Sequence, residues 1–289
     1  AISGTSATAT ATVTTKTSSG TTIGSNSVSF TVTVPASVVP TISSIAVSEA
    51  VAAVKSNVGV YLKGQSQLNI TITAAAETSA GIATGSAISS YSTTIDGVTY
   101  VGSAFTTNML KTAGDSIEIT TTVTDKRGRT AKKTITVTVY DYASPTITAM
   151  SSYQCDADGT RNSDGTCTKI IVSGKATSVM VGTTEKNTKT LTLKYKAVTA
   201  TAYTTITSPT LSSWSFTAEA IIPNTDPNTT YEFVATLTDK LSSATKSVKT
   251  AITVISRLAG GGGVRLFGEA ESEGFWVGDV DYTITDAEF

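Results

Sequence analysis

The stretch "SFTVTVPASVVPTIS" (residues 29–43) decides the fold, because its pattern returns 105 residues later in "KTITVTVYDYASPTIT" (residues 133–148). In both copies apolar residues alternate with polar ones, mostly Thr, which is the period of a β-strand with one face on a core and the other in water. Corresponding positions are Phe30 and Ile135, Val32 and Val137, Val34 and Val139, and Pro40 and Pro145. Proline cannot donate a hydrogen bond into a central ladder, so Pro40 and Pro145 mark linkers. The sequence therefore predicts a repeated domain whose last strand precedes each proline.

A second repeat lies just before the first one in each domain. The segment "EITTTVTDKRGRTAKKT" (residues 118–134) resembles "FVATLTDKLSSATKSVKT" (residues 233–250). In both, Thr-Asp-Lys stands between two alternating runs, and an Asp at such a place bonds the backbone two residues on, which predicts a hairpin turn. A third copy of the last strand is expected at residues 251–256, "AITVIS".

The composition favours an all-β protein. Threonine makes up about a fifth of the chain, hydrophobic residues 39% and charged residues 15%, and Thr and Val fit a pleated, half-buried surface better than a helix. The formal net charge of −1 gives no electrostatic case for nucleic acid or an acidic membrane. No apolar run reaches the roughly 20 residues that cross a bilayer. We therefore expect neither nucleic acid nor a membrane as a partner.

We predict tandem immunoglobulin-like antiparallel β-sandwiches followed by a short Gly-rich C-terminal segment. Short strands, turn signals such as Asp96-Gly97 and a repeat of about 105–115 residues are typical of that architecture. The alternative is a β-solenoid, but the period is too long for one coil of a solenoid. The expected segments are a partial domain or small sheet (1–39), two sandwiches (40–144 and 145–256) and a terminal segment (257–289).

The terminal segment differs in composition from the rest of the chain. It contains four consecutive glycines and has two Arg against seven acidic residues. Its large aromatic residues must be buried against something, and so few residues form a poor core alone. We therefore expect this segment to dock on a neighbouring chain in a homo-oligomer, through Phe267, Phe275, Trp276 and Tyr282.

An enzyme is not expected, because the sequence contains no histidine. This removes the commonest general base, the Ser-His and Cys-His nucleophile pairs and most zinc sites. Paired carboxylates could still hydrolyse a glycosidic bond, but the acids lie mostly at turns and in the terminal segment. We predict no cofactor, apart from the calcium alternative below.

The most distinctive local sequence is "CDADGTRNSDGTC" (residues 155–167). Its Asp and Gly residues fit a long hairpin turn, whereas Asp156, Asp158 and Asp164 also resemble an oxygen-rich calcium loop that lacks the flanking helices and the terminal Glu. Cys155 and Cys167 flank the loop symmetrically, so a hairpin would place them opposite each other. A disulfide between them and two separate thiols are both compatible with this spacing.

The segment "TVTDKRGRTAKKTITVTVYDYASPTITAMSSYQCDADGT" (residues 122–160) resembles the Ig-like modules of minor structural and tail-fibre proteins of long-tailed phages, especially those of Gram-positive hosts. "GGGGVRLFGEAESEGFWVGDVDYTI" (residues 260–284) resembles a terminal segment of such proteins. "DKLSSAT" (residues 239–245) departs from the pattern because it lacks the Arg-Gly turn. The resemblance implies a virion structural protein in the tail region, forming a fibre or appendage that attaches to the host surface. It also implies a homotrimer, contacts with other virion proteins and no catalytic residue.

Two other classes of function fit the composition. The first alternative is a bacterial cell-surface adhesin or stalk of Ig-like repeats. The second is an accessory carbohydrate-binding module, which requires a flat row of exposed aromatic rings; Trp214 and Trp276 are the only tryptophans, and Trp214 alternates like a core residue. A host-surface glycan is therefore an expected partner without a located site.

Overall fold

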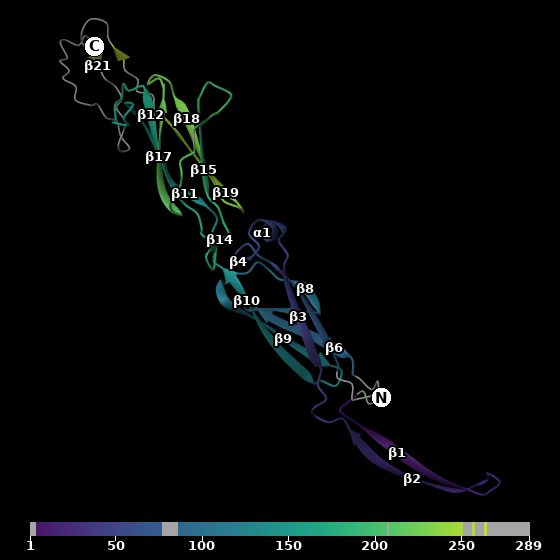
Figure 1. Ribbon diagram of the computed structural model, residues 1–289. Helices are drawn as coiled ribbons and strands as arrows, with labels where there is room; N and C mark the ends of the chain where they lie inside the picture. The colour runs from purple at the N-terminus through teal and green to yellow at the C-terminus, as the bar shows by residue number, and fades with distance from the viewer. Residues whose placement is uncertain (1–3, 77–85, 207, 251–255, 258–262, 265–289) are drawn as a thin grey trace, which may run out of the picture. The chain divides into compact units, whose positions relative to one another are not determined.

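The computed structural model describes residues 4–76, 86–206, 208–250, 256–257 and 263–264 (Figure 1). The chain divides into two compact units, Ala1–Tyr142 and Ala143–Phe289, which are described separately below. Within the described residues the secondary structure is nearly all β, and the single α-helix is α1 (Ala52–Asn57). No helix in this part of the chain is long and apolar enough to cross a membrane.

The first unit contains a two-sheet sandwich. One sheet has the order β3 (Thr41–Glu49), β5 (Leu68–Ala75) and β8 (Ala104–Thr106). The other has the order β4 (Tyr61–Leu62), β10 (Thr130–Tyr140), β9 (Gly114–Asp125), β6 (Ile88–Ile95) and β7 (Val98–Val101). All neighbours pair antiparallel except β4, which adds to β10 in parallel. This is an immunoglobulin-like sandwich, as the sequence predicts.

Alternation along the strands fills the core of this sandwich. Ile70, Ile95, Ile119 and Val123 are almost completely buried and form one cluster, while their sequence neighbours point outward. A polar pair is also buried in this sandwich. Thr93 on β6 lies opposite Thr121 on β9, and both residues are fully buried. Their hydroxyl oxygens are 2.9 Å apart, so one hydroxyl donates a hydrogen bond to the other inside the core.

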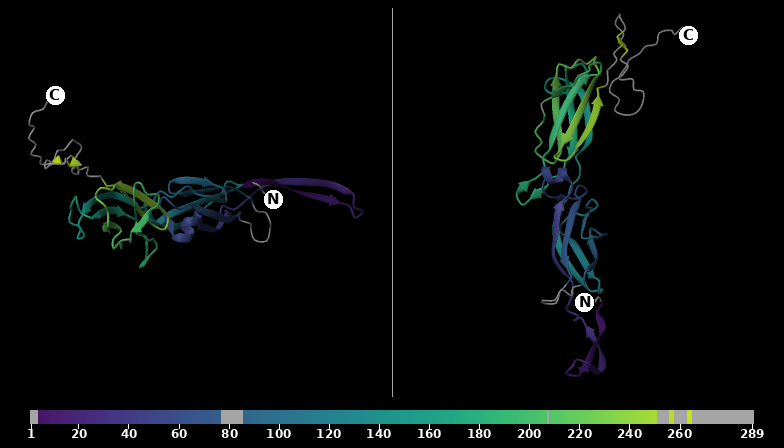
Figure 2. Two further views of the ribbon diagram at one scale, coloured as in Figure 1. Left: turned by 90° about the horizontal axis from the view of Figure 1, so that it is seen from above. Right: turned by 90° about the vertical axis from the view of Figure 1, so that its right-hand side faces the viewer.

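The second unit repeats the two-sheet architecture (Figure 2). One sheet has the order β11 (Thr146–Cys155), β12 (Cys167–Lys175) and β17 (Ser215–Pro223). The other has the order β16 (Thr204–Ile206), β15 (Thr190–Ala197), β18 (Tyr231–Thr238) and β19 (Ser243–Lys249). Two short hairpins complete the described strands: β13 (Met180–Val181) with β14 (Thr184–Glu185), and β20 (Ser256–Arg257) with β21 (Gly263–Val264).

In the core of the second unit, the cross-strand position that corresponds to Thr93 and Thr121 holds two apolar residues. Leu193 on β15 lies opposite Ala235 on β18, in the register that Thr93 and Thr121 occupy in the first unit. Both are buried in a cluster with Phe233. A hydrogen-bonded pair of hydroxyls in one unit is therefore replaced by a large and a small apolar side chain in the other.

The hairpin turns use the chemistry that the sequence predicts. Asp125 is buried, and its Oδ1 accepts hydrogen bonds from the main-chain N–H groups of Arg127 (2.8 Å) and Arg129 (2.9 Å). Asp239 does the same for Leu241 and Ser242, at 2.8 Å each. The turn between β6 and β7 has positive φ at Asp96 and Gly97, as the Asp-Gly signal requires.

The first copy of the repeated strand does not belong to a sandwich in the described structure, and here the prediction of a core-facing strand is wrong. β2 (Thr22–Thr33) pairs only with β1 (Ser6–Lys16), in a two-stranded hairpin (Figure 1). Phe30 is 50% exposed and Val28 64% exposed. Alternation shows that a strand has two unlike faces, but it does not show that a second sheet covers one of them. In β10 the equivalent residues Ile135 and Val137 do pack against the first core.

Arg129 ties the linker after this hairpin to the sandwich of the first unit. Its guanidinium donates to the carbonyl oxygens of Val34 and Val38, each at 2.6 Å, and also to that of Pro35. Arginine presents its donors as a rigid fork, which suits several carbonyls at once. The Arg-Gly-Arg turn therefore holds the linker in addition to closing the β9–β10 hairpin.

Strands β5, β6, β9, β12, β15 and β18 are among the short strands that a repeat of this length predicts. Helix α1 and the short strand β4 were not predicted. The expected strand at 251–256 lies mostly outside the described residues, as does almost all of the terminal segment 257–289. The domain limits 1–39, 40–144, 145–256 and 257–289 stay a prediction.

Candidate functional site

The loop between β11 and β12 builds its own turns with its polar side chains. Asp156 accepts a hydrogen bond from the Asn162 amide at 2.9 Å, and Asp158 accepts one from the Thr160 N–H at 2.8 Å. The Asn162 side-chain oxygen accepts from the Asp164 N–H at 3.0 Å. The hydrogen bonds from Thr160 keep the pKa of Asp158 below its ordinary value. These contacts fit the expected long hairpin turn.

The same contacts bear on the calcium alternative. Within the described part of the chain no three His, Cys, Asp or Glu side chains gather closely enough to hold one metal ion. Asp156, Asp158 and Asp164 therefore do not form such a group. Calcium binding at this loop gains no geometric support and remains a prediction.

Cys155 and Cys167 lie directly opposite each other on β11 and β12, and both are buried. Directly opposed residues of antiparallel strands have Cα atoms about 4.5–5.5 Å apart, within the range that a disulfide spans. The structure has them as two thiols. Burial raises the pKa of Cys155, and the neighbouring Cys167 and Asp156 act in the same direction. The disulfide remains a prediction, now with a register that permits it.

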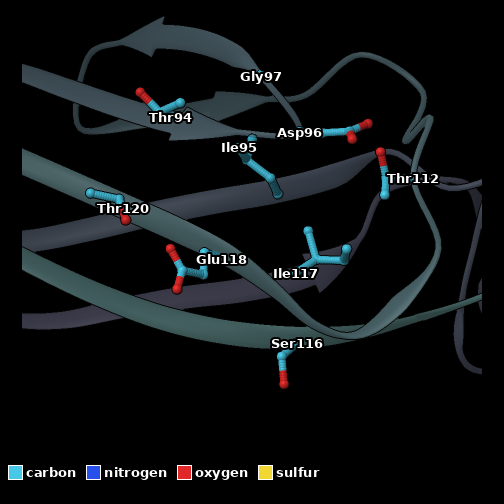
Figure 3. A pocket seen from close by; sticks show the side chains of 9 residues that line it. All are labelled: Thr94, Ile95, Asp96, Gly97, Thr112, Ser116, Ile117, Glu118 and Thr120. Atoms are coloured by element: carbon cyan, nitrogen blue, oxygen red, sulfur yellow. The ribbon is translucent and has the colours of Figure 1, made fainter.

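A shallow hollow of about 540 Å³, with a mixed polar and apolar lining, lies over the β6–β9 face of the first unit (Figure 3). Asp96 stands beside Thr112 at one end, and Glu118 and Thr120 project from β9. Partial burial acts to raise the pKa of Asp96, but hydrogen bonds from the Thr112 side chain and from the main chain at Lys111 and Thr112 outweigh it and keep the pKa low. Asp96 is thus an ionised turn residue and a poor general acid.

A second groove, of about 570 Å³, lies between β3, α1, β4 and β10. Its lining combines the rings of Tyr61 and Tyr140 with Glu49 and Lys55. Glu49 Oε1 accepts from the main-chain N–H groups of Val51 (2.9 Å) and Gln67 (3.3 Å), whereas its Oε2 is buried and has no hydrogen-bond partner among the described residues. Burial and the Glu49 charge raise the pKa of Tyr61.

Sequence reasoning missed this groove. Tyr140 is 79 residues from Tyr61, and the parallel pairing of β4 with β10 brings Tyr61 opposite Val139, the residue before Tyr140. The run "AVAAVKSN" (residues 50–57), which contains helix α1, was the available signal, because it interrupts the alternation between two strands.

Other predicted site residues do not gather into a site. Trp214 is half-buried, and the Lys189 ammonium lies 4.2 Å from the centre of its ring. Among the exposed large hydrophobic residues of the described ranges, Phe30 and Tyr203 are the aromatic ones, so no flat row of rings is present there. Phe267, Phe275, Trp276 and Tyr282, predicted to dock on another chain, lie outside the described residues.

Comparisons with solved structures return multidomain β-sandwich proteins. The three N-terminal domains of the bacteriophage RB49 Highly Immunogenic Outer Capsid protein (Hoc) are 12% identical, with 83% of this chain and 86% of that chain covered and a TM-score of 0.34. Domains A168–A170 of titin are 13% identical, with coverages of 84% and 74% and a TM-score of 0.29. The FN1–FN3 domains of chicken CNTN1 are 14% identical, with coverages of 66% and 64% and a TM-score of 0.23. At these scores the likenesses carry no functional inference.

No curated protein matches the chain. A family described as "Siphovirus protein of unknown function (DUF859)" matches residues 3–273. This match covers both sandwiches, the hairpin before them and part of the terminal segment. The chain therefore belongs to this family of siphovirus proteins.

Proposed function

We propose that this protein is a structural component of the siphovirus virion, in a tail fibre or tail-associated appendage that contributes to attachment to the host surface. The observation that carries the proposal is the combination of a siphovirus family with successive Ig-like sandwiches. Each sandwich has its own core, so a series of them gives reach, and many copies raise avidity without a strong single site.

The described polar groups support a structural role rather than catalysis. The carboxylates of Asp96, Asp125 and Asp239 each accept main-chain hydrogen bonds, as turn residues do. Together with a sequence that contains no histidine, this favours a protein that binds and connects. We infer no enzymatic activity.

We place contact with a host-surface glycan, most simply from a Gram-positive cell wall, at the groove beside Tyr61 and Tyr140. Aromatic rings offer an apolar surface to the faces of sugar rings, and the lining of the groove also includes the charged residues Glu49 and Lys55. Saturation-transfer NMR with host wall polysaccharide tests the site. Tyr140→Ala should abolish the transfer and Tyr203→Ala, an exposed tyrosine of the second unit, should leave it unchanged.

Other partners follow from the same proposal. We propose that the protein assembles as a homo-oligomer, with a trimer as the first hypothesis, and that it contacts other virion proteins. Nucleic acid and membranes are not among the proposed partners, since the net charge is −1.

Immunogold electron microscopy of purified virions, with antibodies raised against this chain, tests the location. Label confined to the tail or its appendages supports the proposal. Label on the capsid alone would contradict a tail location. If mass spectrometry detects the chain in infected cells but not in purified virions, a virion role is contradicted. The competing function, a bacterial cell-surface adhesin or stalk, predicts label on uninfected cells.

A further inference from the structure

The β1–β2 hairpin has two chemically different faces. The register runs without interruption from Ser6 opposite Thr33 to Thr15 opposite Gly24, so successive residues alternate between the faces over this whole length. One face carries only hydroxyl side chains, and cross-strand pairs connect them: Thr10 with Ser29 at 3.2 Å and Thr12 with Ser27 at 2.7 Å. The opposite face, here called the apolar face, carries Ala7, Ala9, Ala11, Val13, Val28, Phe30 and Val32, and it ends at the polar residue Asn26, which lies opposite Val13.

The apolar face is not covered by any described residue. Val13 is 72% exposed, Val28 64% and Phe30 50%. A two-stranded hairpin alone is marginally stable in water, and a third strand or a packed face is normally required. The same alternation in β10 is covered by the opposite sheet of the first sandwich. An uncovered apolar face of this kind favours packing against another apolar surface.

Two features indicate that the partner is another copy of this chain. First, Lys16 at the tip is the only charged residue between residues 4 and 34, so two hairpins do not repel each other and a charged partner would find no complement. Second, the face is self-complementary: β1 presents a column of small side chains, Ala7, Ala9 and Ala11, and β2 a column of large ones, Val28, Phe30 and Val32. In a two-fold arrangement the large column of each copy fits over the small column of the other.

We propose that the hairpins of neighbouring copies pack together through their apolar faces and connect the chains. The apolar face runs from Ala7 to Val13 on β1 and measures about 24 by 10 Å, so each copy buries about 240 Å², roughly a third of one partner's share of a standard interface. Such an interface is weak in dilute solution and gains strength where copies are held close together, as in an assembled particle. The proposal does not depend on a virion role.

The test compares neighbouring residues on opposite faces in the whole chain. Sedimentation velocity is measured over a hundredfold range of concentration for the wild type, Phe30→Ser on the apolar face and Ser29→Ala on the hydroxyl face. We expect concentration-dependent association of the wild type and S29A, and a monomer for F30S. Phe30 is half exposed in the single chain, so its replacement should leave the sandwiches folded, which circular dichroism checks.

Cysteine labelling identifies the surface involved. With Ala11→Cys and Thr12→Cys, maleimide labelling of A11C should slow by at least tenfold as the concentration rises, while that of T12C stays constant; Cys155 and Cys167 are buried and react slowly. A wild type that stays monomeric, or an F30S variant that associates equally well, would overturn the proposal. Protection of A11C in the monomer would assign the face to a segment of the same chain, and equal protection of T12C would assign the contact to the strand edges; both also overturn it.

Discussion

Lys133 donates from its Nζ to the main-chain carbonyl oxygen of Ser43 at 2.7 Å, across the gap between the last strand of the first sandwich and the first strand of the opposite sheet. The second sandwich has the same contact, from Lys246 to the carbonyl oxygen of Thr148, at 3.2 Å. In both, the acceptor residue is a β-bulge whose hydroxyl bonds back to the partner strand, Ser43 to Thr73 and Thr148 to Ser173. The lysine thus covers a carbonyl that the bulge leaves out of the ladder.

Replacing either lysine should destabilise only its own unit. Lys133→Met or Lys246→Met retains the alkyl chain and removes the donor, and we expect a loss of about 1 kcal/mol, the usual net value of a hydrogen bond. Lys132→Met changes the adjacent side chain, which is exposed on the opposite face, and should cost less than half of that. Urea unfolding monitored by NMR resonances of each unit measures both. Equal losses for K132M and K133M would contradict the role of the contact.

The Arg129 clamp should control the mobility of the linker after the hairpin. Arg129→Lys retains the charge but cannot reach the carbonyls of Val34, Pro35 and Val38 together, so we expect amide exchange at Val38 and Val39 to become at least tenfold faster. Hydrogen exchange read by NMR provides the measurement. Lys126→Gln, in the same turn, serves as the control. Unchanged exchange in R129K would mean that the linker is held by other contacts.

Cys155 and Cys167 should form a single intramolecular disulfide when the chain is oxidised. Their direct opposition permits the bond, and closing so short a loop should stabilise the second unit by about 3 kcal/mol. Because burial raises the pKa of Cys155, labelling of the reduced protein should be slow in buffer and fast in urea. Mass spectrometry after alkylation and a thermal melt check both expectations. Mixed disulfides between chains after oxidation would contradict them.

Glu185 should make the second unit sensitive to acid. Burial acts to raise its pKa, but hydrogen bonds from the Ser178 hydroxyl and from the main chain at Asn187, Val179 and Lys186 outweigh it, so the folded-state pKa is below the ordinary value of about 4.3. The stabilisation is therefore complete above the unfolded-state pKa and is lost as the pH falls through the folded-state pKa.

Glu185→Gln should thus flatten the acid dependence of stability. Between about pH 6 and pH 3 the urea midpoint of the second unit should fall more steeply in the wild type than in E185Q, since only the carboxylate titrates over the range around its ordinary pKa. Glu118→Gln, at an exposed position of the first unit, is the matched control. The same slope in wild type and E185Q would contradict the assignment.

The effects on stability of replacing Thr93 and Thr121, the buried hydroxyl pair of the first unit, should depend on each other. Thr121→Val leaves the Thr93 hydroxyl buried without its partner and should cost about 1–3 kcal/mol. The double variant Thr93→Val/Thr121→Val removes both hydroxyls and should recover most of that loss. A double-mutant cycle by chemical unfolding measures the coupling, and strict additivity would show that the two hydroxyls do not depend on each other.

Much of the fold can be predicted from sequence because it is local or periodic. The alternation in residues 68–75 identifies β5 and its buried face, and Asp96-Gly97 identifies a tight turn whose φ values the structure confirms. The failure at β2 has a physical cause: alternation is a property of one strand, whereas burial depends on a second sheet. The roles of Lys133 and Arg129 were missed because a charged residue at a strand or turn usually lies in water, and their acceptors are about 90 residues away.

The candidate sites are less predictable for the same reason. Cys155 and Cys167 could be paired from their symmetric flanking of one loop, because a hairpin is local. The groove of Glu49, Tyr61 and Tyr140 depends on the parallel pairing of β4 with β10, which no pattern in the sequence predicts.

The Thr93–Thr121 pair of the first core and the Leu193–Ala235 pair of the second bear on how the chain avoids misfolding. Neighbouring repeats with similar strands are prone to exchange strands during folding. A strand carrying Thr121 in the second sandwich would bring an unpaired hydroxyl against Leu193, and one carrying Ala235 in the first would leave the Thr93 hydroxyl without its partner and open a void. Each mispairing costs on the order of 1–3 kcal/mol. The different side chains at this position in the two cores therefore disfavour strand exchange between the tandem copies.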